Sequence, residues 1–141
     1  MISYMQELTI HFNNSEVFSH LRSGIRSYLH QSIPSNPTII EVAFNEAVNN
    51  AVKHSKNAGN PTVTVAVRVK ERKRLLIRVK DQGCGFPAYE TMNRLNDAYS
   101  QSLPDELLMK ESGRGLMIMN QVMDKVIYNK QGNEVLLMKR L

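Results

Sequence analysis

A segment near the middle of the chain carries an unusual line of polar side chains. Glu46, Asn50 and Lys53 are spaced at i, i+4 and i+7, so on a helix they stack along one face. Asn45 and Asn49 widen this face, although each asparagine costs a helix up to about 0.7 kcal/mol relative to alanine. A helix that accepts this cost is expected to use the amides, which both donate and accept hydrogen bonds. The alternative is that the asparagines only satisfy buried polar groups.

A glycine-bearing loop, Asp81-Gln82-Gly83-Cys84-Gly85, is the second candidate for chemistry. Glycines let a backbone approach a flat ligand closely. The Asp81 carboxylate could accept a hydrogen bond from an exocyclic amino group, which adenine has and guanine lacks at that position. Because a D-x-G-x-G loop is short and common, a plain turn with positive φ at the glycines is the alternative.

The third candidate is Gly113-Arg114-Gly115-Leu116, which opens an expected helix. A helix N-terminus presents free N–H groups and the positive end of the dipole, so it can bind an anion. Glycine permits close backbone approach, and Arg114 can add a charge-assisted contact to phosphate. A glycine-rich helix start with a solvated arginine is equally consistent with these residues alone.

Periodicity predicts the elements that must position these groups. Helices are expected from caps at 13–15 to about His30, from Pro37 (with Asn36 as N-cap) to about Lys56, and from about Gly115. Alternation predicts strands at 8–12, 63–69, 75–79, 126–128 and 135–138. The long connection 86–112 is expected to hold one or two short helices and a mobile segment, and connections of that length are usually functional.

Each expected helix has one apolar face, and one layer of helices on one sheet would bury all three. The expected faces are Val17, Leu21, Ile25, Tyr28 and Leu29 in the first helix, Ile40, Ala43, Phe44, Ala47, Val48 and Ala51 in the second, and Leu116, Met119, Val122 and Met123 in the third.

In combination, these segments resemble three ordered boxes of the GHKL ATPase superfamily. The segment 46–54 looks like its N box, 81–86 like its first glycine box, and 113–124 like its second. The chain's length and its segment 132–135 are similar to the anti-sigma-factor serine-kinase branch. The resemblance implies a single Bergerat domain over residues 1–141. Its fold would be α+β: a two-layer sandwich with a mixed, mostly antiparallel sheet and helices on one face.

The resemblance also implies roles for individual residues. Asn50 should ligate Mg²⁺ bound to the triphosphate of ATP, through a hard amide oxygen. Glu46 should act as the general base that takes a proton from a serine hydroxyl. Asp81 should read the adenine amino group, and Gly83 and Gly85 should line the adenine pocket.

The remaining implied contacts concern the phosphates and the last strand. Gly113, Arg114 and Gly115, continuing into Leu116, should close over the phosphates as part of an ATP lid, and Lys53 is a weaker candidate for a phosphate contact. Many relatives have a threonine that supports adenine binding where this chain has Asn133. Asn133 could hydrogen-bond in its place.

The resemblance implies an ATP- and Mg²⁺-dependent protein-serine/threonine kinase that acts as an anti-sigma factor. It would sequester a sigma factor and phosphorylate an anti-sigma-factor antagonist on serine. The alternative is a non-catalytic module in which ATP orders a partner-binding surface, although such a module needs no base at Glu46. Relatives often form homodimers, and the first strand is a candidate edge.

Composition narrows the other classes of function. Apolar residues make up 42% and charged residues 22%, as in ordinary globular proteins. The net charge of +5 favours polyanionic partners, but the basic run 70–74 reads as a solvated hairpin turn. Aromatics are only 6%, without the interleaving of single-strand binders, so direct nucleic-acid binding is not expected. No segment reads as a membrane span or a signal peptide and Cys84 is the single cysteine, so we expect a cytoplasmic protein.

Overall fold

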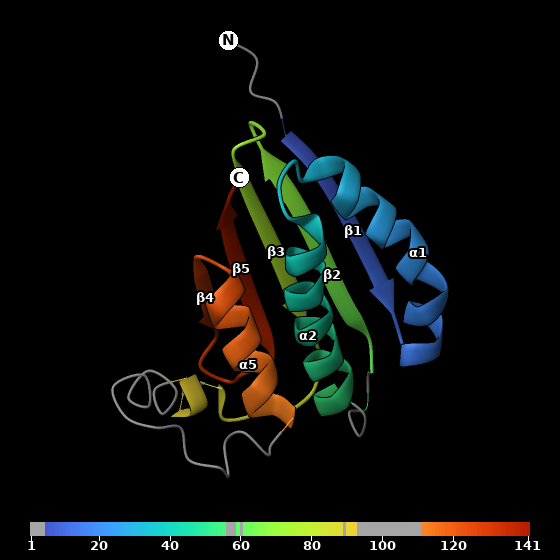
Figure 1. Cartoon of the computed structure of the whole chain (residues 1–141). Coiled ribbons are helices and arrows are strands. Elements are labelled where there is room, and N and C mark those ends of the chain that lie inside the picture. Colours follow the sequence, from blue (N-terminus) through green and yellow to red (C-terminus); the bar gives the residue numbers. More distant parts are fainter. Residues whose placement is uncertain (1–4, 56–58, 60, 89, 93–110) are drawn as a thin grey trace.

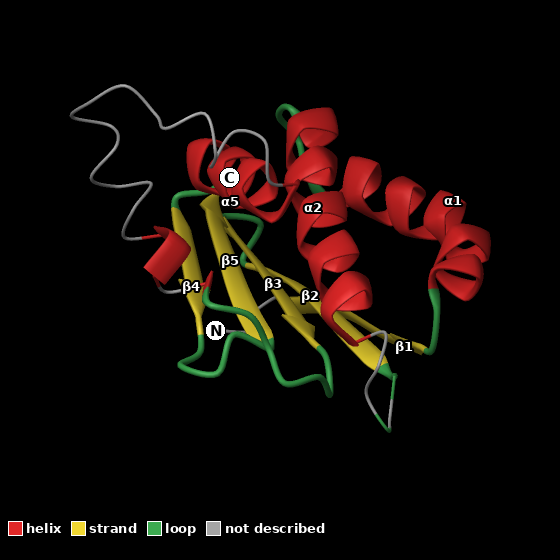
Figure 2. Ribbon diagram, turned by 90° about the horizontal axis from the view of Figure 1, so that it is seen from below, coloured by secondary structure: helices red, strands yellow, loops and turns green. Residues whose placement is uncertain are grey.

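The computed structural model describes residues 5–55, 59, 61–88, 90–92 and 111–141. Within them, one sheet carries three helices on one of its two faces (Figures 1 and 2). The strands are β1 (Met5–Phe12), β2 (Val63–Lys70), β3 (Arg74–Lys80), β4 (Lys125–Tyr128) and β5 (Glu134–Arg140). The helices are α1 (Ser15–Ser32), α2 (Pro37–Ser55) and α5 (Glu111–Val122). The predicted two-layer α+β class is therefore confirmed.

The strand order is β1-β2-β3-β5-β4, and every neighbouring pair of these strands is antiparallel. The expectation of a mixed sheet was therefore wrong. The reason is that β5 lies between β3 and β4, which run in the same direction, so no two parallel strands become neighbours. The predicted position of β1 at an edge is confirmed.

Burial alternates along the central strands as predicted. The residues that face the helices are buried, and they are Val63, Val65, Val67, Val69, Leu75, Ile77, Val79, Val135 and Leu137. The basic run forms an exposed hairpin turn closed by the N–H of Lys73, which donates to the Lys70 carbonyl at 3.0 Å. The prediction of a solvated turn is confirmed.

Helix α1 begins where predicted, because Asn14 caps it by accepting the Val17 N–H at 2.9 Å. Its buried face differs from the expected one. Val17 and Leu21 are 40% and 37% exposed, whereas Phe18 is buried. The Phe18 ring lies 5.0 Å from that of Phe12 and 6.3 Å from that of Phe44, so aromatic packing turns Phe18 into the core instead of Val17.

Helix α2 starts at Pro37 and ends at Ser55, and its whole predicted apolar stripe is buried. Asn49 and Lys53 are exposed, as expected for the opposite face. Asn50, however, is only 5% exposed. It is buried because α5 packs along that side of α2.

Helix α5 starts at Glu111, about one turn before the predicted start at Gly115. Gly113 and Gly115 therefore lie inside its first turns. A Cβ atom at Gly115 would lie 2.8 Å from Glu46 Oε2, so glycine is the residue that lets α5 approach α2 this closely. The packing against α2 outweighs the cost of glycine in a helix. Leu116, Met119 and Met123 are buried as predicted.

The connection after β3 is described only in part. Ala88 and residues 90–92 are helical, which agrees with one of the expected short helices. The rest of the expected mobile segment, residues 89 and 93–110, lies outside the described residues. None of the helices in the described ranges has the length and apolar character that crossing a membrane requires.

Candidate functional site

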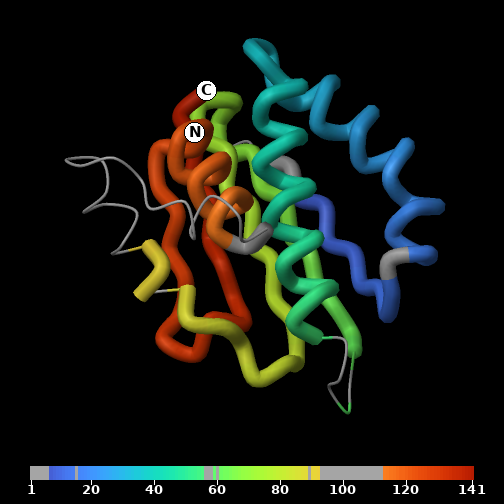
Figure 3. Tube along the Cα trace, turned by 60° about the horizontal axis from the view of Figure 1, so that its bottom comes forward, coloured from blue at the N-terminus to red at the C-terminus, as the bar shows by residue number. Residues whose placement is uncertain are grey.

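A small cavity, partly open to solvent, lies where α2, the end of β3 and the turn between β4 and β5 meet. Its volume is about 10 Å³, which is room for about one water molecule. The residues that line it are Ala47, Asn50, Ala51, Val79, Asp81, Phe86, Tyr128, Gly132, Asn133, Glu134 and Val135. Figure 3 shows why distant parts of the sequence meet here: the segment after β3 runs beside the β4–β5 turn.

Two polar groups at this cavity lack hydrogen-bond partners among the described residues. They are Asn50 Nδ2 and Tyr128 Oη, and both atoms are buried. Burial raises the pKa of Tyr128, a hydrogen-bonding contact with the Asn50 side chain, too loose to count as a regular hydrogen bond, partly offsets this, and the charge of Asp81 raises it further. A buried polar group without a partner costs about 1–3 kcal/mol. Their position beside a cavity indicates that a ligand could satisfy them.

Asp81 sits directly after β3 and is 3% exposed. Its Oδ1 accepts the Gly83 N–H at 2.7 Å, and its own N–H donates to the Asn133 carbonyl at 2.9 Å. Burial raises the pKa of Asp81, and the hydrogen bond from Gly83 only partly opposes this. Because a carboxylate has two oxygens, Oδ2 can serve a donor on a ligand.

Gly83 and Gly85 were predicted to line the adenine pocket, but neither is among the residues that line this cavity. A Cβ atom at Gly83 would overlap the His54 carbonyl at the end of α2, and one at Gly85 would overlap the Gln131 carbonyl. Both glycines therefore let the loop pack against neighbouring backbone. Gly132, which the sequence did not single out as a site residue, lines the cavity and has φ 81°.

Replacing Gly132 with alanine should destabilise the fold by about 1–3 kcal/mol, because its φ is positive and a Cβ atom would overlap the Phe86 carbonyl. Urea denaturation would measure the loss. Gly24 is the matched control, since it lies in α1 with no atom within 4 Å of its would-be Cβ. Gly24→Ala should stabilise by about 0.5–1 kcal/mol. Equal effects of the two substitutions would contradict this account of Gly132.

Asn133 lines the cavity, but its side chain is bonded to protein. Its Nδ2 donates to the Gly83 carbonyl at 3.3 Å, and its Oδ1 accepts from Asn129 Nδ2 at 2.7 Å. Asn129 Oδ1 in turn accepts the N–H groups of Gly132, Asn133 and Glu134 at 2.8, 3.0 and 3.2 Å. Asn133 therefore ties the β4–β5 turn to the loop after β3.

Phe86 and Tyr128 form an aromatic wall that the sequence reasoning missed. The Phe86 ring stacks on His54 with centroids 4.4 Å apart and meets the edge of Tyr128 at 5.3 Å. Burial lowers the pKa of His54, and Lys53 lowers it further, so the stacked imidazole is neutral at neutral pH. The available signals were the place of Phe86 directly after the glycine loop and the alternation that turns Tyr128 inward in β4.

The second predicted box meets the N box at Gly115, and the N box meets the first glycine box at the cavity. A Cβ atom at Gly115 would lie 2.8 Å from Glu46 Oε2 and 3.5 Å from Asn50 Nδ2, and Asn50 shares the cavity with Asp81. Glu46 is half-buried, so it keeps some access to solvent.

The other residues that were predicted to contact the phosphates do not line the cavity. Arg114 and Lys53 are exposed and do not line the cavity, and Gly113 is buried. The side chain of Leu116 lies entirely in the hydrophobic core, so only its backbone could face a ligand.

Comparison with known proteins shows which family and which relatives this chain is similar to. The sequence profile of a family described as "Histidine kinase-like ATPase domain" matches residues 15–139. The serine-protein kinase RsbW of Bacillus licheniformis is 36% identical over 88 residues, covering 62% of this chain and 53% of the relative. Thus the match spans about half of that relative's length.

Two further relatives match over most of their length. The anti-sigma F factor of Clostridium acetobutylicum is 27% identical over 131 residues, covering 89% of this chain and 87% of the relative. That of Geobacillus stearothermophilus is 27% identical over 132 residues, covering 91% and 86%. A chain in the crystal structure of the SiaB-SiaC complex from Pseudomonas aeruginosa has the same fold, with a TM-score of 0.65, 15% identity, and coverage of 95% and 88%.

Proposed function

This chain belongs to the histidine kinase-like ATPase domain family, and from that premise we propose that it binds ATP at the cavity between α2, the 81–85 loop and the β4–β5 turn. The observation that carries the proposal is the pair of buried, unpartnered groups, Asn50 Nδ2 and Tyr128 Oη, beside the buried Asp81. ATP supplies donors and acceptors on its base and acceptors on its phosphates, so it can satisfy such groups, and its base can at the same time fill apolar space.

The adenine would lie against Asp81 and the aromatic wall. Asp81 would accept a hydrogen bond from the exocyclic amino group, and Phe86 would offer a ring for stacking. The cavity of about 10 Å³ is far smaller than the roughly 300–1,000 Å³ of ligand pockets. Binding would therefore require the side chains that line it to make room for the base.

The phosphates would lie toward Glu46, Asn50 and the first turns of α5. Because α5 starts at Glu111, Gly113 lies in its first turn, where the backbone N–H groups have no partner within the helix, and Arg114 can add positive charge. The amide oxygen of Asn50 would hold magnesium together with oxygens of the triphosphate and water, which are the hard ligands that this ion prefers. Bound magnesium would supply neutralisation of the charge on the transferred phosphoryl group.

The activity we propose is that of a regulatory protein-serine/threonine kinase that sequesters a sigma factor and phosphorylates an anti-sigma-factor antagonist. The names of the relatives support it, since one is a serine-protein kinase and two are anti-sigma F factors. Glu46 lies one helical turn from Asn50 and keeps solvent access, as a base that receives a serine proton needs. A homodimer and a cytoplasmic location remain predictions.

Nucleotide binding by the purified chain tests the first step. We expect calorimetry to show binding of ATP in the presence of Mg²⁺, and weaker binding when EDTA removes the metal. GTP should bind at least about tenfold more weakly, because guanine has a carbonyl where Asp81 requires a donor. A protein that circular dichroism shows to be folded, but that takes up neither nucleotide, would refute the proposal. Equal affinity for ATP and GTP would refute the role of Asp81.

A further inference from the structure

The face of the sheet that points away from the helices is not covered by any described element (Figure 2). Strand register places alternate residues on it, such as Ala66 next to Arg78 and Ile127 next to Leu136. In ordinary two-layer folds an open sheet face is mostly polar. This face combines a strong charge with an apolar hollow, and these two features together indicate a docking surface.

Positive charge is concentrated on this face. Seven basic residues lie on it: Arg68 and Lys70 on β2, Arg74, Arg78 and Lys80 on β3, Lys125 on β4 and Arg140 on β5. Two acidic residues on the strands, Glu7 and Glu134, share the face, and Asp124 borders it beside Arg140. The excess of four positive charges (seven minus three) is most of the formal net charge of the chain, +5, so attraction for an acidic partner is concentrated here.

The two acidic residues are already engaged within the chain. Glu134 is paired with Arg78, and Glu7 Oε2 lies 3.3 Å from Arg68 Nε. Both arginine side chains are more than half exposed (63% and 51%), so each can still receive a second carboxylate. These ion pairs hold the arginines along the border of the apolar hollow.

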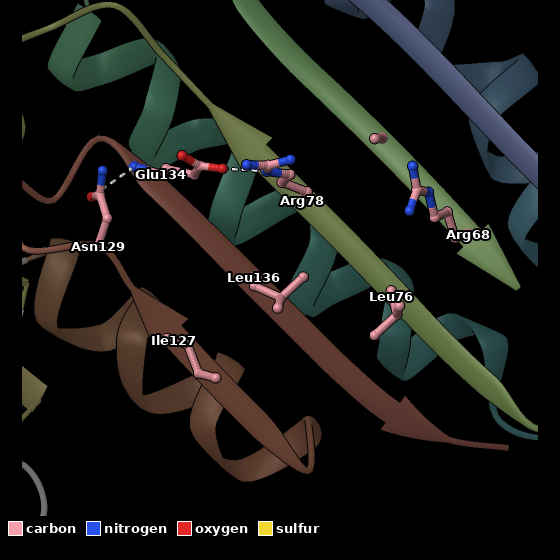
Figure 4. A pocket seen from close by; sticks show the side chains of 8 residues that line it. Arg68, Leu76, Arg78, Ile127, Asn129, Glu134 and Leu136 are labelled. Atoms are coloured by element: carbon pink, nitrogen blue, oxygen red, sulfur yellow. Dashed lines mark hydrogen bonds and ion pairs between the residues drawn. The ribbon is translucent and has the colours of Figure 1, made fainter. Parts of the chain in front are cut away.

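The hollow itself is apolar at its centre. Figure 4 shows Leu76, Leu136 and Ile127, from β3, β5 and β4, lying side by side across the sheet with Arg78 and Arg68 along one side. The hollow has a volume of about 500 Å³. Ile127 is 51% exposed, which is unusual for an isoleucine in the middle of a strand. A surface with an apolar centre and a charged border is typical of a protein interface.

We propose that this open face docks an acidic, amphipathic helix of a partner protein, with its apolar stripe on Leu76, Leu136 and Ile127 and its carboxylates on Arg68 and Arg78. A helix is the element that covers a sheet face in this fold, as α2 does on the other side. The site lies on the other face of the sheet from the nucleotide cavity and shares only Glu134 with its lining, so the proposal does not depend on ATP binding.

Other occupants fit less well. Two copies of this face would each carry an excess of four positive charges and would repel each other. Nucleic acid would leave the apolar centre unused, and the outward strand positions carry no phenylalanine, tyrosine or tryptophan on which a base could stack; the one imidazole, His11, is on β1 at the edge of the sheet. An acidic protein segment uses both the charge and the apolar surface.

The test uses the full chain and a designed peptide of about 18 residues, with leucines at helical spacing on one side and glutamates on the other. Fluorescence anisotropy should show binding that weakens as salt rises. Ile127→Asp should weaken it at least about tenfold, and Arg78→Gln should weaken it by a smaller factor. Ile39→Asp is the matched control, because Ile39 is 50% exposed but lies on α2, and it should leave the affinity unchanged.

Four further measurements separate the occupants. A scrambled peptide with the same glutamates should bind at least about tenfold more weakly; equal binding would show attraction by charge alone and overturn the proposal. Tighter binding of duplex DNA, or of vesicles of phosphatidylcholine and phosphatidylserine, would also overturn it. The proposal would also be overturned if sedimentation showed that the wild-type chain is a dimer and that Ile127→Asp abolishes this dimer. If ATP affinity is unchanged in Ile127→Asp while the peptide is lost, the two sites are independent.

Discussion

Replacing Glu46 with glutamine should lower phosphoryl transfer from ATP to a serine-bearing partner by about 10²–10⁴-fold. Glutamine has nearly the same shape and can keep the contact with Gly115, but its amide cannot take a proton. Binding of ATP should therefore stay close to wild type, so that the loss falls on kcat and not on nucleotide affinity. The rate of phosphoryl transfer can be measured with ATP that is labelled at the γ-phosphate. The acceptors are proteins of the native host that co-purify with the chain.

The matched control is Glu41→Gln on the same helix. Glu41 faces α1, where its oxygens lie 3.5 Å from Arg26 Nε and 3.6 Å from His30 Nε2, and it does not line the cavity. Its loss should leave transfer unchanged. Full activity of Glu46→Gln would remove Glu46 as the base. Undetectable transfer by the wild type, with normal partner capture by both variants, would instead favour the non-catalytic module.

Replacing Asp81 with asparagine should weaken ATP binding by about 10–100-fold. The asparagine Oδ1 can still accept the Gly83 N–H, so the loop keeps its 2.7 Å hydrogen bond. The asparagine Nδ2, however, is a donor where Asp81 Oδ2 is an acceptor. It would face the exocyclic amino group of adenine, which is also a donor. Calorimetric titration of both proteins with Mg²⁺-ATP would measure the difference.

The stability of Asp81→Asn should move in the opposite direction. Burial raises the pKa of Asp81 in the folded state, so ionisation costs more in the folded than in the unfolded chain. The free energy of unfolding therefore falls as pH rises from the ordinary pKa through the raised one, and the deficit persists at neutral pH. Asparagine lacks this cost, so the variant should resist urea at pH 7 at least as well as the wild type. A lower urea midpoint would contradict this.

Asp124→Asn supplies the control for both measurements. Asp124 Oδ2 accepts a backbone N–H, that of Arg140 at 2.6 Å, but the residue is exposed and remote from the cavity lining. Its pKa is lowered, chiefly by this hydrogen bond. We therefore expect unchanged ATP affinity and equal or slightly lower stability. A loss of ATP binding as large as that of Asp81→Asn would mean that the effect is not specific to the cavity.

The sequence predicted the fold well because its periodicities are strong. Val63 to Val69 alternate without interruption, and all six apolar positions predicted for α2 are buried. Errors arose where two neighbouring faces were both apolar. In α1, Val17 and Phe18 compete for the core, and only the positions of Phe12 and Phe44 decide in favour of Phe18. The start of α5 was misplaced because local propensity disfavours glycine, whereas the packing on α2 requires it.

The sequence predicted individual site residues better than their arrangement in space. Glu46, Asn50 and Asp81 were selected as site residues by their residue types, and the structure places Asn50 and Asp81 at one cavity. No local pattern indicated that Tyr128, 47 positions after Asp81, would lie beside them. That neighbourhood depends on β5 pairing with β3, a long-range contact that a single sequence does not encode in its periodicity.

This pairing also affects the order in which the molecule can be assembled. Strands β2 and β3 are joined by a short turn, whereas the register that sets Lys80 opposite Glu134 closes a far longer loop. Short loops close at lower entropic cost, so the β2–β3 hairpin can exist before β5 arrives. The cavity cannot, because Asp81 comes from one segment and Asn133 from the other. A ligand held there binds only chains in which both segments have joined, and by mass action it stabilises the complete sheet against unfolding.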